Sequence, residues 1–166
     1  RIQVLTASGR LWKTVGSRGS GPGELESPSG VAVGKEGEIV VADRGNNRVV
    51  VFSPKGEFLR DIGDGVGSSD TQFQAPSSVA IGPQGEVVVS DYGNHRVKVF
   101  TIEGELLRVL GESEDRAERL HYPAGVAVSA DGILFVADSG NHRVVALTED
   151  GEVVQEYFGD KGGDLA

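Results

Sequence analysis

The chain has 166 residues, including 25 glycines but no cysteine or methionine, and carries a formal net charge of −9 with 38% hydrophobic residues. This length can enclose a hydrophobic core, and the apolar content excludes a disordered or collagen-like chain. Without cysteine there is no disulfide, thiol nucleophile or thiolate metal ligand. No apolar run approaches the roughly 20 residues of a membrane-spanning helix, so the sequence indicates no transmembrane segment.

The charge is unevenly distributed along the chain. Residues 1–23 hold four of the 16 basic residues and no acid, so the remainder sets 12 basic residues against 25 acids, a net charge of −13. An acidic surface repels phosphate backbones. The charge therefore disfavours broad electrostatic binding of nucleic acid and leaves room only for a local basic patch.

A tandem repeat organises the chain. The stretches 28–63, 76–111 and 123–159 each read Pro, two small residues, an apolar triplet, a Gly turn, an apolar run and then Asp-x-Gly-Asn-x-Arg-Val, before a second Gly turn and a closing Gly. The motif Asp recurs at offsets of 48 and 47 residues, as Asp43, Asp91 and Asp138. A period of this length with four short apolar segments is typical of a β-propeller blade.

Taken along the chain, residues 1–16 match the third and fourth strands of a repeat and are expected to form an outer half-blade, followed by four-stranded blades at 28–63, 76–111 and 123–159. In the second blade we expect strands at Val79–Ile81, Glu86–Ser90, Arg96–Thr101 and Glu105–Leu110, each bounded by Gly, Pro, Asn or Asp. The short first strands suit the crowded centre of a propeller. The second strands are continuous apolar runs, as expected for strands covered on both faces.

The connections give further predictions. The Gly-rich segment 16–23 is interpreted as a flexible linker between blades, and the helix-forming residues of segment 112–119 favour a short helical turn. The fourth strand of the last blade is one residue longer than its counterparts, which predicts a β-bulge near Gln155 or Glu156. Residues 160–166 are expected to start a linker to a further blade.

The half-blade and the three predicted four-stranded blades add up to about three and a half blades, whereas a closed propeller generally has about four or more. We therefore expect the remaining blades to come from the same parent chain. A homodimer fits less well, because the half-blade of each copy carries the third and fourth strands, and two such halves do not complement each other.

The run Pro-x-Gly-Val-Ala-Val, followed by Val-Ala-Asp-x-Gly-Asn-x-Arg-Val-x-Val-Phe, resembles the NHL repeat, and the resemblance covers essentially the whole chain. It implies that the chain is part of a six-bladed closed propeller. NHL domains occur on tripartite-motif ubiquitin ligases, growth-regulating RNA repressors, bacterial sensor kinases and the lyase that amidates peptides. The resemblance therefore implies protein binding, RNA binding or catalysis, and it narrows the fold more than the function.

The Asp-x-Gly-Asn-x-Arg motif occurs in every blade, which favours a structural role over a catalytic one. The Asp carboxylate is expected to accept backbone N–H bonds in its own loop and to pair with the Arg five residues on, while Gly and Asn suit left-handed backbone. The structural residues are Asp43, Gly45, Asn46, Arg48, Asp91, Gly93, Asn94, Arg96, Asp138, Gly140, Asn141 and Arg143.

Functional information is expected where the blades differ, in loops that project toward one face of the disc. Arginine and aromatic side chains there have the chemistry that is enriched in interface hot spots. The candidate binding residues are Arg44, Asn47, Phe73, Tyr92, His95, Ser139 and His142. Solvated loops without a partner are the alternative at each position.

Metal and phosphate sites have weaker support. His95 and His142 occupy one slot and invite a zinc hypothesis, but Asn47 holds that slot in the preceding blade, and His121 lies in a linker with no evident partner. Calcium needs about six to eight oxygen ligands, and the Val-Ala-Val inner strands supply no acid. Segment 16–23 lacks the Gly-Lys-Ser/Thr ending of a phosphate loop. We therefore predict no metal, cofactor or catalytic residue.

The leading hypothesis is a non-enzymatic scaffold that binds a protein or peptide through blade-specific loops on one face. A metal-dependent propeller enzyme, similar to an amidating lyase or a lactonase, is the alternative. An RNA-binding NHL domain is the second alternative.

Overall fold

The computed structural model describes residues 1–113 and 119–158. The described residues form β-strands joined by turns and three short 3₁₀ turns, with no helix long and apolar enough to cross a membrane. The strands are β1 (Ile2–Leu5), β2 (Leu11–Val15), β3 (Ser17–Arg18), β4 (Glu24–Leu25), β5 (Pro28–Val33), β6 (Ile39–Asp43), β7 (Arg48–Phe52), β8 (Phe58–Ile62), β9 (Ser78–Ile81), β10 (Val87–Asp91), β11 (Arg96–Phe100), β12 (Leu106–Leu110), β13 (Pro123–Val128), β14 (Leu134–Asp138), β15 (Arg143–Leu147) and β16 (Val153–Phe158).

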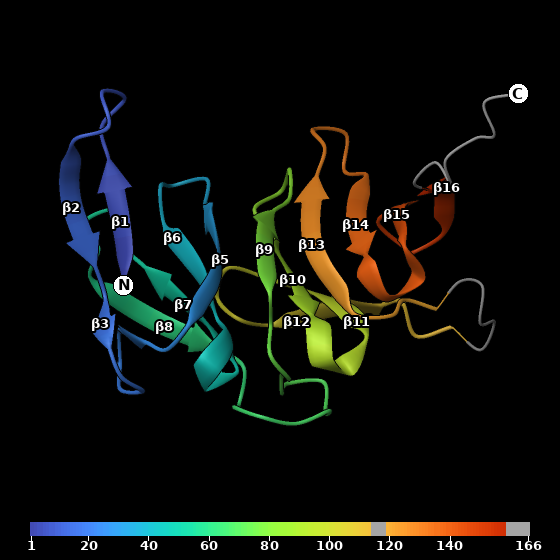
Figure 1. Cartoon of the computed structure of the whole chain (residues 1–166), viewed down its shortest axis with the longest axis horizontal. Helices are drawn as coiled ribbons and strands as arrows, with labels where there is room; N and C mark the ends of the chain where they lie inside the picture. Colours follow the sequence, from blue (N-terminus) through green and yellow to red (C-terminus); the bar gives the residue numbers. More distant parts are fainter. Residues whose placement is uncertain (114–118, 159–166) are drawn as a thin grey trace, which may run out of the picture.

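The strands form three antiparallel four-stranded sheets, β5–β8, β9–β12 and β13–β16, preceded by the two-stranded sheet β1–β2. In Figure 1 these sheets follow one another across the molecule from the N-terminal to the C-terminal side. The first strands lie innermost, because β9 contacts both β5 and β13. The predicted all-β fold, with blades of four strands, is confirmed.

The inner strands approach each other closely. A Cβ atom added to Gly30 of β5 would lie 2.8 Å from the Cα of Ser78 in β9, so only glycine fits this position without a shift of the backbone. All five residues of β6 and of β10 are buried. Apolar cores fill the spaces between successive sheets, and valine is the commonest residue in them. The stability of each sheet therefore depends on its neighbours, as in other repeat proteins.

One flank of the third blade lacks such a neighbour among the described residues. Val144 and Tyr157 are 37% and 50% exposed, whereas Val49 and Ile62, the residues at the same repeat positions in the first blade, are 0% and 1% exposed. The flank of β13–β16 thus has the residue pattern of an inter-blade contact while its side chains face solvent.

Short parallel pairings occur in the first two linkers between blades. In the first of them, predicted to be flexible, β3 pairs in parallel with β4. Val66 and Phe73 form the equivalent parallel bridge in the next linker. Of the segment predicted to form a helical turn, residues 114–118 lie outside the described residues, as do residues 160–166 of the predicted final linker.

Phe73 corrects one prediction, because this candidate binding residue is fully buried. Its ring packs against Phe100 with centroids 5.6 Å apart. It also covers Gly63, where an added Cβ would lie 2.6 Å from the ring. Leu25 and Leu120, each 1% exposed, hold the same position in the other two linkers. Phe73 therefore anchors its linker to the core and is not available to a partner.

The predicted bulge lies close to its expected position, but the extra residue of the strand is not its cause. The register irregularity in β16 lies between Val153 and Gln155, opposite Leu147 and Ala146, and so adjoins the predicted Gln155. The strand pairs β1–β2, β7–β8 and β11–β12 share this irregularity. The extra residue of β16 instead extends the ladder, since Phe158 pairs with Arg143.

The Phe73 anchor gives the first testable prediction. Phe73→Ala should lower the free energy of unfolding by about 3–5 kcal/mol, because it removes a buried ring and leaves a cavity. Phe73→Leu is the matched control, since Leu25 and Leu120 serve the same position, and it should cost less than about 1.5 kcal/mol. Urea unfolding followed by tryptophan fluorescence measures both, and equal losses for the two variants would contradict the anchoring role.

Candidate functional site

A buried carboxylate stands at the end of the second strand of every blade. Asp43, Asp91 and Asp138 are each 0% exposed. One oxygen of each accepts a backbone N–H bond from the preceding linker, donated by Glu26, Gln74 or His121 over 2.6–2.7 Å. The prediction of N–H bonds from the Asp's own loop is therefore wrong, because the donors lie 17 residues earlier in the chain.

The second carboxylate oxygen accepts bonds from the Asn and Arg of the same motif. In the second blade Asn94 Nδ2 donates over 2.8 Å and Arg96 Nε over 3.0 Å to Asp91. The first and third blades repeat both contacts at 2.7–3.0 Å, so the predicted Asp–Arg pairing is confirmed. The carboxylate is fully hydrogen-bonded, which suits a structural charge better than a catalytic one.

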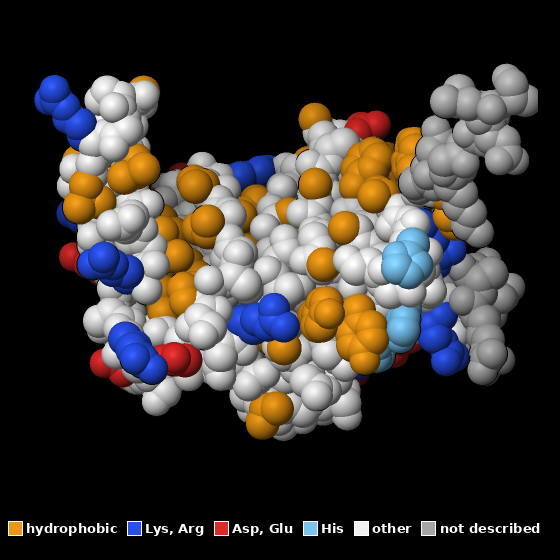
Figure 2. All heavy atoms as spheres, viewed as in Figure 1, with side chains coloured by type: hydrophobic (Ala, Val, Ile, Leu, Met, Phe, Trp, Pro, Cys, Tyr) orange, Lys and Arg blue, Asp and Glu red, His pale blue; other side chains and the backbone are white. Residues whose placement is uncertain are grey.

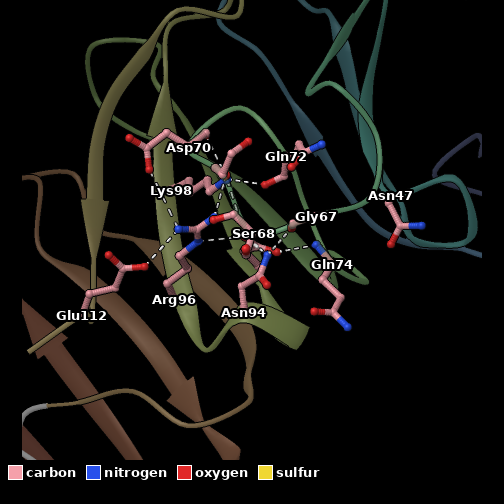
Figure 3. Close-up of polar contacts among 12 residues, drawn as sticks. Asn47, Gly67, Ser68, Asp70, Gln72, Gln74, Asn94, Arg96, Lys98 and Glu112 are labelled. Carbon is pink, nitrogen blue, oxygen red and sulfur yellow. Dashed lines mark hydrogen bonds and ion pairs between the residues drawn. The ribbon is translucent and has the colours of Figure 1, made fainter.

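The Arg and Asn side chains continue this network into the linker. In the second blade Arg96 donates to the carbonyls of Ser68 and Ser69 and to the Glu112 carboxylate, while Asn94 donates to the carbonyl of Gly67. Figure 3 shows these side chains pointing toward the linker. Since the linker would otherwise hold several carbonyls without partners, the motif fixes the loops at this end of the blade.

The motif glycine is needed for space, and not for a left-handed backbone as predicted. A Cβ on Gly93 would lie 2.8 Å from the carbonyl oxygen of Gln74, to which the Gly93 N–H donates. The residues with positive φ in the three turns are Asn47, His95 and His142, at 54°, 58° and 55°. Each follows the motif Asn and closes a 3₁₀ turn, η1 (Arg44–Asn46), η2 (Tyr92–Asn94) or η3 (Ser139–Asn141).

Lys98 is a buried cation that sequence reasoning missed. It is 0% exposed, and its Nζ donates to the carbonyls of Ser69, Asp70 and Gln72 (Figure 3). Its Nζ also lies 3.6 Å from Asp91. Burial lowers the pKa of Lys98, and the charge of Asp91 opposes that shift. The signal was available in the repeat, since the equivalent residues of the other blades are Val50 and Val145.

The residue that follows the 3₁₀ turn, Asn47 in the first blade and His95 in the second, forms a hydrogen bond to the linker of the next blade. The Asn47 Oδ1 accepts a bond from the N–H of Ala75 at 2.8 Å, and the His95 Nδ1 accepts one from the N–H of Tyr122 at 3.0 Å. Ala75 and Tyr122 each precede the proline that opens the next blade and have φ near +50°. The slot thus combines a left-handed backbone with a side-chain acceptor, which asparagine and histidine both provide.

Four aromatic rings meet beside this slot, and we call Tyr92, His95, His121 and Tyr122 the aromatic cluster. The ring of Tyr122 lies 5.1 Å from Tyr92, 4.2 Å from His95 and 4.6 Å from His121 between centroids. The exposed Arg44 of the first blade lies 5.3 Å from the Tyr92 ring. Figure 2 shows histidine side chains beside hydrophobic ones on the face in view.

The cluster lies on the loop face, the end of the sheets that carries the 3₁₀ turns and the linkers. Its rings come from turn η2 and from the linker before β13, and Arg44 adds a cation from η1. Tyr122 is 39% exposed. Cation–π and ring-edge contacts pre-order these side chains, so the cluster offers solvent a prearranged aromatic surface.

The seven predicted binding residues have different positions. Arg44, Tyr92 and His95 come together at the cluster, and Asn47 joins the first and second blades. Ser139 and His142 are exposed on the third blade. Sequence reasoning missed Tyr122 and left His121 without a partner. A signal was present, because the residue before the proline that opens each blade is small in two linkers (Ser27, Ala75) and aromatic in the third (Tyr122).

The histidines do not gather into a metal centre among residues 1–113 and 119–158, where no group of three His, Asp or Glu side chains could hold an ion. His95 stacks with His121, at 4.8 Å between ring centroids, and not with His142. Burial, followed by the neighbouring His121, lowers the pKa of His95. The imidazole is thereby favoured in its neutral form, which is the form that accepts the Tyr122 bond.

Comparison with known proteins identifies the repeat. The family model described as NHL repeat matches residues 25–52, 73–100 and 120–147, together just over half of the chain. Each matched segment runs from the buried linker residue, Leu25, Phe73 or Leu120, to the end of the third strand of its blade.

Curated relatives match part of the chain. The E3 ubiquitin-protein ligase TRIM71 of Rattus norvegicus is 47% identical over 64 residues, which cover 34% of this chain and 8% of that protein. Protein lin-41 of Caenorhabditis elegans is 50% identical over 46 residues, covering 28% of this chain and 4% of that protein. The matched segments therefore span less than a tenth of these relatives.

Solved structures share the fold at low sequence identity. Virginiamycin B lyase of Staphylococcus aureus superposes with a TM-score of 0.68 at 16% identity, over 95% of this chain and 48% of that one. A gluconolactonase of Xanthomonas campestris gives a TM-score of 0.68 at 20% identity, over 93% of this chain and 53% of that one. These likenesses show the propeller architecture alone.

The buried Asp network gives the second prediction. Asp91→Ala should lower the free energy of unfolding by about 3–5 kcal/mol, because it removes the carboxylate paired with the buried Lys98 and leaves the buried Arg96 with only the half-exposed Glu112 at close range. Glu26→Gln, which breaks the exposed pair with Arg18, should cost at most about 1 kcal/mol. Thermal and urea unfolding of both variants provide the measurement, and a mild loss for Asp91→Ala would show that the carboxylate is not the centre of the network.

Proposed function

Because the chain belongs to the NHL-repeat family, we propose that it is a non-enzymatic interaction scaffold that binds a protein or peptide through the loop face. The support comes from the aromatic cluster and Arg44. Their contacts bring exposed rings and a cation from three successive repeats into one surface. Tyrosine and arginine are over-represented among residues that dominate binding energy at interfaces.

The charge of this surface also supports a protein partner over a nucleic acid. Arg44 forms no ion pair with a carboxylate among residues 1–113 and 119–158, so its guanidinium is available to a partner. One cation beside four rings suits a short peptide segment. Binding to phosphate backbones usually needs several cations, whereas the chain carries a net charge of −9.

We further propose that additional blades of the parent chain cover the exposed flank of β13–β16. Val144 and Tyr157 support this, because their repeat equivalents are buried between blades. The six-bladed ring that the NHL resemblance implies would place the loop face on one side of a closed disc. The aromatic cluster lies between the second and third blades and is complete without them.

The test begins with a random peptide library displayed on phage and selected on the folded chain at pH 7.5. We expect the selected peptides to bind the double variant Arg44→Ala/Tyr92→Ala about 30-fold more weakly, since loss of a hot spot costs about 2 kcal/mol. Fluorescence anisotropy with labelled peptides measures the affinity. Gln84→Ala, in the exposed turn at the opposite end of the second blade, is the control and should bind like the parent chain.

Unchanged binding by the double variant would refute the loop-face assignment. If no peptide is enriched while a random single-stranded RNA library binds at physiological salt, the RNA-binding alternative replaces the proposal. If the purified chain instead holds stoichiometric metal together with lyase or lactonase activity, the enzyme alternative does so. Circular dichroism should show the same fold for every variant used.

A further inference from the structure

The hydrogen bond between His95 and Tyr122 differs chemically from its counterpart one blade earlier. At the first seam Asn47 accepts the N–H of Ala75, and at the second seam His95 accepts the N–H of Tyr122. An amide oxygen accepts this bond at every ordinary pH. An imidazole Nδ1 accepts it only while that nitrogen carries no proton. The junction between the first and second blades therefore has an acceptor that does not titrate, Asn47. The equivalent junction between the second and third blades has one that does, His95.

The surroundings of His95 set how it responds to protons. Its ring stacks on His121 at an interplanar angle of 23°, and Tyr122 presents an edge at 68°. Glu112 and Arg119 line the same cavity as His95. Glu112 pairs with Arg96 at 2.9 Å, while Arg96 also pairs with Asp91. Glu112, which lines this cavity, is thus already paired with Arg96, and the neighbouring His121 disfavours protonation of His95.

The bond also reaches the buried network of the third blade. The N–H of His121 donates to Asp138 at 2.6 Å, and its carbonyl accepts the N–H of Gly140 at 2.7 Å. His121 and Tyr122 are consecutive residues, so the His95 bond fixes the linker immediately beside the Asp138 contact. Loss of the bond would leave the Tyr122 N–H without its acceptor and release the two linker rings of the aromatic cluster.

We propose that His95 is a pH-sensitive latch between the second and third blades, which closes the aromatic cluster when neutral and opens it when protonated. This rests on the proposed function, because it assigns a regulation to the same loop face. The latch supplies the side chain from one blade and the backbone donor from the next.

The direction of the effect follows from proton linkage. The pKa of His95 is lowered in the folded chain, first by burial and then by His121, whereas an unfolded histidine titrates near 6.5. Below pH 6.5 the unfolded chain binds more protons than the folded one, so stability decreases as the pH falls through this range. The latch is fully formed above pH 6.5 and is lost as the pH falls through the lowered pKa of His95.

The experiment follows the His95 ring and the Tyr122 amide by NMR between pH 7.5 and 5.0, in the chain without any partner. We expect both signals to titrate together with one midpoint below 6.5. His95→Asn is the matched variant, because asparagine holds the equivalent slot at residue 47. In the His95→Asn variant the Tyr122 amide signal should not change with this midpoint. The melting temperature of the variant at pH 7.5 should stay near that of the parent chain.

A second variant separates the latch from its neighbour. His121→Gln removes the stacked histidine and should move the shared midpoint toward 6.5 while keeping the coupling between ring and amide. The latch is refuted if the Tyr122 amide ignores the titration of His95, or if His95→Asn keeps the same pH response at that amide.

Peptide binding provides the functional readout. Peptides selected at pH 7.5 should bind the parent chain about fivefold or more weakly at pH 5.5, within the usual range of coupling between two sites, and should bind His95→Asn equally at both values. Coupled titration with pH-independent binding would refute the regulatory role while leaving the loop-face proposal intact. Failure of the loop-face proposal would leave the NMR test of the latch unaffected.

Discussion

The buried carboxylate that ends each second strand is the interaction on which the rest of the chain depends. It carries a negative charge at 0% exposure, a state that requires complete hydrogen bonding. The linker N–H, the motif Asn and the motif Arg provide this bonding in every blade. The same Arg and Asn then bond linker carbonyls, so one charge fixes the turn, the linker and the third strand together.

This arrangement frees the residues next to the network to vary. The position after the Asp is Arg44, Tyr92 or Ser139, and none of these side chains is needed by the buried carboxylate. A rigid support beneath variable exposed side chains is the usual basis of a binding surface built on loops. The aromatic cluster forms where Tyr92 of η2 and His95, which follows η2, meet the large linker residues His121 and Tyr122.

Repetition made the fold and the Asp–Arg pairing predictable, because a residue that recurs at a fixed offset must serve a need common to every blade. The wrong or missing predictions concern which way a side chain faces and which residues it contacts. Phe73 resembled an exposed linker aromatic, but its alignment with Leu25 and Leu120 would have indicated burial. The His121 and Tyr122 contacts were missed because they join segments about 26 residues apart across two blades. The 3₁₀ turn and the positive φ of the slot residue bring them together, and no local pattern encodes that geometry.

The buried Lys98 limits how the repeats of such a chain can recombine during evolution. Its ammonium needs the carbonyls of Ser69, Asp70 and Gln72, which belong to the linker before its own blade. The first and third blades have valine at this position. A recombination that joined the second blade to another linker would replace the three carbonyls that surround this buried cation, whereas exchange of the linker and blade as one segment would keep them. The unit of inheritance here is therefore a linker with the blade that follows it, and the repeats, although alike in sequence, are not interchangeable.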